Sequence, residues 1–208
     1  MIALLVSTFA ATAATFDMPI TIYVEEPPSI TNLTKDDVLL ATIDSINEWQ
    51  VDGSSVEIMT EFDPTATISI KVVWDITAEQ ADGVWGFSSI YIYEEQPETI
   101  IFSTIRMVSD RSWTDDDSLD FHSVLIHEIG HSIGFQHSTD PESTMYYMAS
   151  SGETNKRDLT NADMQMVREA YPYVPVINEQ KEEENKGCGS SFLSFMFLPV
   201  MLRKRYIK

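Results

Sequence analysis

All four histidines of this chain fall within one short stretch, from His122 to His137. Within that stretch, residues 127–137 read HEIGHSIGFQH. His127 and His131 are four residues apart, so on an α-helix both imidazoles project from the same face. Gly134 follows three residues later and can take the left-handed conformation that ends a helix and turns the chain back. The fold must therefore contain a helix that ends in a tight turn and brings His137 back towards the other two histidines.

Three imidazoles that converge in this way are suited to bind one metal ion. Zn²⁺ in proteins takes four ligands, and three nitrogen ligands leave one position open to water, as in hydrolytic rather than structural sites. We therefore predict that His127, His131 and His137 hold one catalytic Zn²⁺, with Glu128 beside the metal but not bound to it. The alternative, a core helix with incidental histidines, would leave three imidazoles without partners. His122 lies off the metal-facing side, and we predict no ligand role for it.

The motif HExxHxxGxxH resembles the signature of the metzincin metallopeptidases, and its continuation is similar to the matrixin branch of that family. Residues 137–146 read HSTDPESTMY, with Ser directly after the third histidine and Met eight residues beyond it. This resemblance implies that Met145 is the Met-turn residue beneath the metal. Thr160 and Asp163 form a capping-box-like start that resembles the entry to the family's last helix. The resemblance extends from about Pro19 to Tyr173.

The remaining pattern predicts an α+β fold. A helix should begin at residues 34–37 (TKDD) and run to about Gly53, with an apolar face formed by Leu39, Ile43, Ile46 and Trp49. β-branched and aromatic runs predict strands at residues 20–24, 56–59, 68–73, 85–93 and 99–108. With the resemblance, this order predicts a metzincin-like catalytic domain that has a mixed, twisted five-stranded sheet, a long first helix, a zinc-binding helix and a C-terminal helix.

The resemblance also implies an activity, that of a zinc-dependent endopeptidase acting on extended protein substrates. Glu128 would take the proton of the attacking water and pass it to the leaving amine. An extended peptide would pair with an edge strand at residues 86–92 (GFSSIYI), and the loop at residues 149–157 would line the main specificity pocket. Ordinary sheet packing is the alternative for residues 86–92.

The chain departs from the matrixin pattern in three ways. It has no histidine before His122, so the second, structural zinc of vertebrate matrixins is not expected. The only cysteine, Cys188, follows the domain, so a cysteine-switch prosegment is not expected either. Tyr147 stands where matrixins usually have proline, and the resulting S-x-M-x-Y pattern resembles the astacin and serralysin branches. Tyr147 is therefore a candidate fifth ligand or oxyanion stabiliser, and a wall of the substrate pocket is the alternative.

Four aspartates before the zinc helix, Asp115–Asp117 and Asp120, have two interpretations. Hard carboxylate ligands suit Ca²⁺, which family members often bind. Carboxylates at a helix N-terminus also complement the helix dipole. We favour the second interpretation and keep Ca²⁺ as a possible additional cofactor.

Both ends of the chain look like targeting segments. Residues 1–15 contain an apolar run followed by Ala11-Thr12-Ala13, a signal-peptidase type of site, although no basic residue precedes the run. After a catalytic domain at residues 16–173 we expect a charged linker at 174–186. Residues 187–208 combine Gly187-Cys188, an apolar run and a basic end, an order that resembles the C-terminal sorting signals of prokaryotic surface proteins. We expect export and attachment to the membrane or cell surface; a C-terminal helix of the domain is the alternative for this tail.

The net charge of the chain limits the kinds of partner that it can bind. It carries 33 acidic and 13 basic residues, a net charge of −20, and such a surface repels the phosphates of nucleic acids. We expect a monomer that binds peptide or protein substrates and no nucleic acid. Two other classes remain open: a non-catalytic zinc-containing surface binding or adhesion module, and a metalloenzyme with a non-peptide substrate. The presence of Glu128 beside a full ligand set argues against the first.

Overall fold

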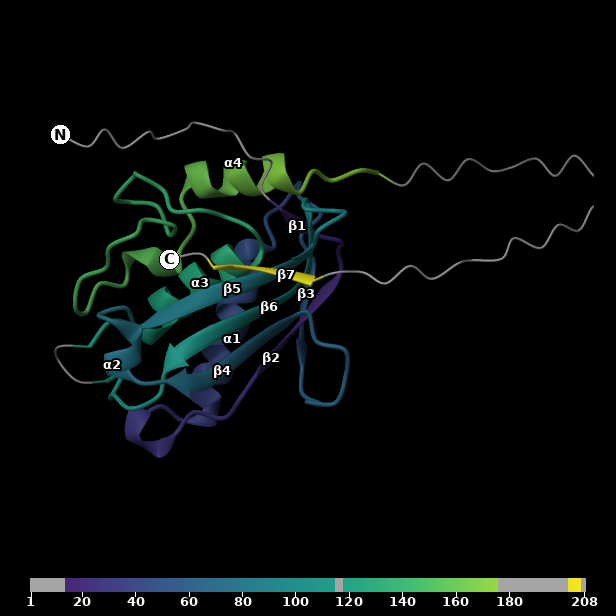
Figure 1. The fold of residues 1–208 in the computed structure, drawn as a ribbon. Coiled ribbons are helices and arrows are strands. Elements are labelled where there is room, and N and C mark those ends of the chain that lie inside the picture. The colour runs from purple at the N-terminus through teal and green to yellow at the C-terminus, as the bar shows by residue number, and fades with distance from the viewer. Residues whose placement is uncertain (1–13, 115–117, 176–201, 207–208) are drawn as a thin grey trace, which may run out of the picture.

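The computed structural model describes residues 14–114, 118–175 and 202–206 (Figure 1). Its helices are α1 (Lys35–Trp49), α2 (Ala78–Ala81), α3 (Phe121–Ser132) and α4 (Asn161–Ala170), with 3-10 turns at Ser29–Thr31 and Asn155–Arg157. Its strands are β1 (Thr15–Phe16), β2 (Ile20–Val24), β3 (Ile58–Glu61), β4 (Ile70–Ile76), β5 (Gly86–Tyr93), β6 (Thr99–Val108) and β7 (Leu202–Tyr206). The predicted α+β class is confirmed.

One sheet, in the order β3-β2-β4-β6-β5-β7, organises the described residues. Strands β3, β2, β4 and β6 are parallel, whereas β5 runs antiparallel to β6 and β7 antiparallel to β5. The five predicted strands are all present, and β6 has the predicted bounds. Two strands were not predicted: β1, which pairs with the start of β6, and β7, which lies along the outer edge of β5 (Figure 1).

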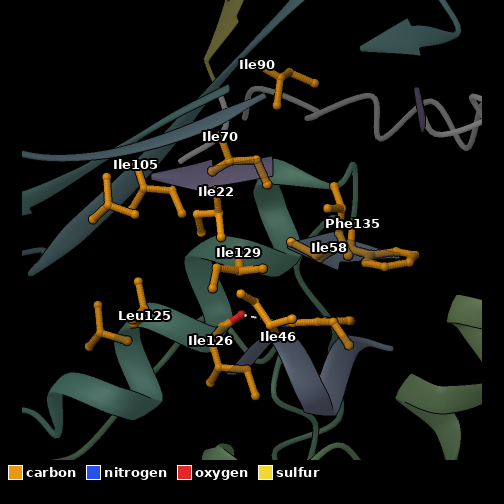
Figure 2. Close-up of a cluster of buried hydrophobic side chains, with 14 of the residues drawn as sticks. Ile22, Ile46, Ile58, Ile70, Ile90, Ile105, Leu125, Ile126, Ile129 and Phe135 are labelled. Atoms are coloured by element: carbon orange, nitrogen blue, oxygen red, sulfur yellow. Dashed lines mark hydrogen bonds between the residues drawn. The ribbon is translucent and has the colours of Figure 1, made fainter. Parts of the chain in front are cut away.

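Helices α1 and α3 lie together behind the sheet (Figure 1). The hydrophobic core fills the space between the sheet and these two helices. Figure 2 shows Ile129 of α3 between Ile22 of β2 and Ile46 of α1. The indole Nε1 of Trp49, at the end of α1, donates a hydrogen bond of 2.9 Å to the carbonyl of Ile126. This bond satisfies the buried indole N–H and ties α1 to the middle of α3. The helix that carries the histidines is therefore fixed from two sides.

The apolar face of α1 differs from the predicted one. Ile46 and Trp49 are buried as predicted, but Ile43 is 37% exposed. Thr42 and Ser45 take buried positions instead, because their hydroxyls donate to the carbonyls of Val38 and Ala41 within the helix and so leave no polar group unpaired. The predicted start is confirmed: Thr34 and Asp37 form a capping box.

The predicted terminal segments lie mostly outside the described residues. Outside them lie residues 1–13 of the predicted signal peptide, 176–186 of the predicted linker, and 187–201 and 207–208 of the predicted tail. The part of the tail that is described forms β7, and Ala14 next to β1 is buried. No helix in the described part of the chain has the length and apolar character needed to cross a membrane.

Candidate metal centre

The helix that carries the histidines begins at a carboxylate cap. Asp120 accepts a hydrogen bond of 2.8 Å from the backbone N–H of Ser123 and forms an ion pair with Arg157. The bonds from Arg157 and Ser123 hold the pKa of Asp120 below its ordinary value, although burial acts against them. Asp120 is thus the helix cap that we favoured, whereas Asp115–Asp117 lie outside the described residues.

His127, His131 and His137 are brought together at the end of α3. One ring nitrogen from each lies within 4.8 Å of those of the other two, and the Nε2 atoms of His131 and His137 are 3.1 Å apart. Tetrahedral zinc with bonds of about 2.0–2.1 Å places its nitrogen ligands roughly 3.3–3.4 Å apart. The three side chains therefore fit one zinc ion with little movement. His122 is not part of this group, in agreement with the prediction.

Backbone carbonyls fix the orientation of two of these rings. The Nδ1 of His127 donates to the carbonyl of Thr144, and the Nδ1 of His131 donates to that of Phe135, each over 2.7 Å. With Nδ1 protonated, the neutral imidazole presents the lone pair of Nε2, which is the atom that a metal needs. The donor set is thus preorganised for a cation rather than for a further hydrogen bond.

Gly134 makes the turn that returns the chain to His137. Its φ is +102°, which favours glycine, and a Cβ at this position would lie 2.0 Å from the carbonyl oxygen of Ala14. The N–H of Phe135 then donates to the carbonyl of Gly130, which closes the end of the helix. The predicted left-handed turn is confirmed.

Met145 is fully buried and packs against α3 at Gly130. The turn that carries it is joined to the third histidine's segment, because the N–H of Ser138 donates to the Met145 carbonyl over 2.8 Å. A Cβ on Gly130 would approach the Met145 sulfur to 2.4 Å and the Trp49 ring to 2.5 Å. Only glycine at this position lets Met145 and Trp49 pack directly against the helix that carries the histidines.

Two charged residues that the sequence did not single out for this role hold the Met145 turn. The buried carboxylate of Asp163 accepts from the Ser143 hydroxyl (2.5 Å) and the Thr144 N–H (3.1 Å), so the helix-capping residue also supports the turn. Thr144 in turn accepts the hydrogen bond from His127. The ammonium of Lys156, a residue only 2% exposed, donates to the carbonyls of Tyr146 and Met148. Burial lowers the pKa of Lys156.

Glu128 is 5% exposed, and one of its carboxylate oxygens, Oε2, accepts a hydrogen bond of 2.8 Å from the hydroxyl of Ser88 on β5. Burial raises the pKa of Glu128 to about 7, and the bond from Ser88 acts in the opposite direction. A carboxyl group with a pKa close to neutral can both take up and release a proton at physiological pH.

The other predicted parts of the site are Tyr147, the loop at residues 149–157 and the edge of β5. Tyr147 is 59% exposed, and its ring centroid lies 6.3 Å from that of His137. Within the loop at residues 149–157, Lys156 is the buried residue, and the Glu153 carbonyl accepts a bond from Ser123 at the start of α3. The outer edge of β5 is occupied, since Ser89–Tyr93 pair with Leu202–Tyr206.

The buried histidines make the stability of the metal-free protein depend on pH. Burial lowers the pKa of His127 to about 4 and that of His131 to about 3, against 6.5 for an ordinary histidine. Between the lowered pKa of each histidine and the ordinary value of 6.5, the unfolded chain binds a proton that the folded chain does not. The free energy of unfolding therefore falls as the pH falls below about 6.5. Glu128 has the opposite effect on stability. Its raised pKa stabilises the folded protein at low pH, and this stabilisation is lost as the pH rises from 4.5 to about 7.

Two histidines outweigh one glutamate, so we expect a lower urea midpoint at about pH 5 than at about pH 7 for the chelator-treated chain. Glu128→Gln removes the opposing group and should steepen this difference. Equal midpoints at the two pH values in both proteins would show that the histidines are not buried in the neutral form.

Comparison with known proteins agrees with this geometry. The sequence model of the matrixin family matches residues 21–172. Human matrilysin is 31% identical over 113 residues, which cover 49% of this chain and 42% of matrilysin. The metalloendoproteinase 2-MMP of Arabidopsis thaliana is 41% identical over 61 residues (29% of this chain, 16% of the relative), and matrix metalloproteinase-16 of Rattus norvegicus is 36% identical over 67 residues (30% and 11%). The matched segments span less than half of the length of these relatives.

Proposed function

This chain belongs to the matrixin family, and from that premise we propose that it is a zinc-dependent endopeptidase that hydrolyses extended segments of proteins. The observation that carries the proposal is the convergence of three imidazoles, two of them oriented by backbone carbonyls, beside a buried carboxylate. A zinc ion bound by His127, His131 and His137 would polarise the scissile carbonyl and increase the acidity of a water molecule.

In the mechanism that we propose, Glu128 is the general base and then the general acid. It takes the proton of the attacking water and passes it to the nitrogen of the leaving amine. Met145 takes no part in the proton transfers and keeps the floor of the site in place. The ring of Tyr147 lies next to that of His137, with 6.3 Å between the centroids, and we propose Tyr147 as a contributor to oxyanion stabilisation.

The proposal has a direct test against the other two classes of function. The zinc-loaded chain is incubated with an unstructured protein, with and without a hydroxamate, which chelates catalytic zinc. We expect cleavage that the hydroxamate stops. A binding module would cleave nothing, and a metalloenzyme with a non-peptide substrate would leave the protein intact while hydrolysing esters or other amides.

We further propose that the substrate backbone pairs with the outer edge of β5, next to the site. The edge accepts an extended chain, because β7 pairs with Ser89–Tyr93 in antiparallel orientation. Ser88, directly before this paired stretch, contacts Glu128 and so places the edge beside the base. A substrate and β7 cannot use the same edge at once, so the substrate must displace β7.

Removing residues 176–208 is therefore expected to lower KM, by about tenfold if the edge is free in about one molecule in ten of the full chain. Lys204→Pro is the matched variant that keeps the tail but cannot form β7, because proline lacks the N–H and does not fit a regular strand. It should lower KM to the same extent. An unchanged KM in both proteins would show that β7 does not compete with the substrate.

We propose that the domain acts outside the cell and is attached to the membrane or surface through residues 187–208. The export signal lies within residues 1–15, and a cut after Ala13 of the Ala11-Thr12-Ala13 site would leave Ala14 and Thr15 in the folded domain. Four of the 13 basic residues lie in the last six positions, so the charge of the remaining chain is even more acidic than the total of −20 suggests. A tail held by a membrane would leave the edge of β5 free. Surface attachment and pairing with β5 are thus mutually exclusive states of the same residues.

A further inference from the structure

Three buried serine hydroxyls form a line of hydrogen bonds that ends on Glu128. The Ser103 hydroxyl on β6 donates to that of Ser132 over 2.9 Å, with the Ser89 carbonyl as a more distant acceptor at 3.2 Å. Ser132 donates to Ser88 over 3.3 Å. Ser88 donates to Glu128, with both the carboxylate Oε2 and the backbone carbonyl at 2.8 Å. All three serines are fully buried. The line therefore connects two neighbouring strands and the end of α3 to the carboxylate, out of contact with solvent.

The direction of these bonds has a chemical consequence. Each hydroxyl has one proton to donate, and when Ser103 and Ser132 donate along the line, the proton of Ser88 is left for Glu128. Successive hydroxyls that point the same way polarise one another and strengthen the last bond. A buried carboxylate needs such a donor, because removing it from water without a hydrogen bond is costly. The line thus stabilises the ionised form of Glu128 in one orientation.

The helix separates this line from the histidines. Ser132 lies four residues after Glu128 and therefore on the same side of α3, facing β5. His127 and His131 take the neighbouring side, where the three imidazoles converge. Ser88 of the sheet therefore holds Glu128 on one side of α3, while His127 and His131 face His137 on the neighbouring side.

We propose that Ser88, supported by Ser132 and Ser103, is a positioning residue that holds Oε2 of Glu128, so that Oε1 is the oxygen that exchanges protons with water and with the leaving amine. This inference rests on the proposed function and deepens it. Ser88 keeps its own proton throughout; only Oε1 gains and loses one. Because Ser88 belongs to the strand proposed to pair with the substrate, it also fixes the base relative to the bound peptide.

The test compares Ser88→Ala with Ser45→Ala in the full, zinc-loaded chain. Ser45 is the matched control, since it is an equally buried serine on α1, away from the histidines, whose hydroxyl donates to the carbonyl of Ala41 in the same helix. We expect Ser88→Ala to lower kcat about 10- to 100-fold with KM unchanged, the effect of losing a hydrogen bond to a charged group. Ser45→Ala should keep the kcat of the unaltered chain, and Ser88→Thr, which retains the hydroxyl, should keep most of it.

A second readout does not need activity. In the zinc-free protein, the infrared difference between the unaltered chain and Glu128→Ala isolates the carboxylate stretching bands of Glu128. We expect Ser88→Ala to shift these bands and Ser45→Ala to leave them in place. Should Ser88→Ala fail to fold, Ser132→Ala removes the next hydroxyl of the line and should give the same shift in a weaker form.

The outcomes separate the two proposals. Absence of peptidase activity in the unaltered chain would overturn the proposed function, while the infrared bands would still report on Ser88. A kcat for Ser88→Ala equal to that of Ser45→Ala, a loss confined to KM, or unshifted bands would overturn the positioning role. In the Glu128→Ala background, Ser88→Ala should have no further effect, because the group that it positions is gone.

Discussion

Replacing Glu128 with alanine is expected to lower peptide hydrolysis by about 100- to 10,000-fold, the usual contribution of a general acid–base group. The protein should keep its zinc, because neither the carbonyls that orient His127 and His131 nor the turn that returns the chain to His137 involves Glu128. The measurements are kcat/KM on an unstructured substrate and the zinc content of the purified variant.

The matched control is Glu142→Ala, which removes an exposed carboxylate from the segment between His137 and Met145. It leaves the net charge equal to that of Glu128→Ala and should keep nearly full activity. Peptide hydrolysis that survives Glu128→Ala at the level of Glu142→Ala would contradict the role assigned to Glu128. Loss of zinc in Glu128→Ala alone would assign it a role in metal binding instead.

Gly134→Ala is expected to have the largest effect on stability, roughly 2–4 kcal/mol, from backbone strain and overpacking combined. The φ of +102° disfavours alanine, and the added Cβ would lie 2.0 Å from the Ala14 carbonyl oxygen, a backbone atom that cannot move without displacing β1. The same turn brings His137 to the other histidines, so zinc affinity should fall together with the urea midpoint.

Gly152→Ala is the matched variant that separates the two causes of the loss in Gly134→Ala, backbone strain and the steric clash with Ala14. Gly152 also has a positive φ, +68°, but nothing lies within 4 Å of a Cβ at this position. This variant should lose only about 1 kcal/mol, the cost of the left-handed conformation for a non-glycine residue, and bind zinc as tightly as the unaltered chain. Equal losses in the two variants would mean that the contact with Ala14 does not constrain the turn.

The parts of the fold that local pattern determines were predictable from the sequence. The histidine spacing and Gly134 predicted the helix α3 and its turn, and Thr34 and Thr160 predicted the starts of α1 and α4. Strand β6 was predicted to the residue, because a long β-branched run carries a strong signal. Strand β3 begins two residues later than predicted, at Ile58 rather than Val56, since its pairing with β2 and not its own composition sets its start.

The features that depend on distant partners were not predictable. Strand β1 has only two residues, and it exists because Thr15 and Phe16 pair with the start of β6. Buried Thr42 and Ser45 look like solvent-facing residues of a helix until their bonds to helix carbonyls are seen. Propensity and periodicity depend on residues that are neighbours along the chain. They therefore do not predict strand pairing or hydrogen bonds that form only in the folded protein.

The candidate site shows the same difference between local and distant contacts. The three histidines lie close together in the sequence, so their spacing alone predicted that they converge. Ser88 lies forty positions from Glu128, and Lys156 is ten positions from the carbonyl of Tyr146 that it binds. By pattern, a serine in a strand and a lysine in a polar loop are ordinary surface residues.

One weak signal was present for Asp163. The sequence identified it as part of the helix cap at Thr160, which bonds to its Oδ2, while its Oδ1 accepts from Ser143 in the Met145 turn.

We propose that this chain uses zinc and Glu128 to hydrolyse peptide bonds. To test this, the purified zinc-loaded chain is incubated with a denatured protein mixture, and the new termini are sequenced. We predict many new termini with a shared side-chain preference, none of which appear with the chelator-treated chain or with Glu128→Ala. No new termini from the zinc-loaded chain, or the same termini with Glu128→Ala, would show that the chain does not work in this way.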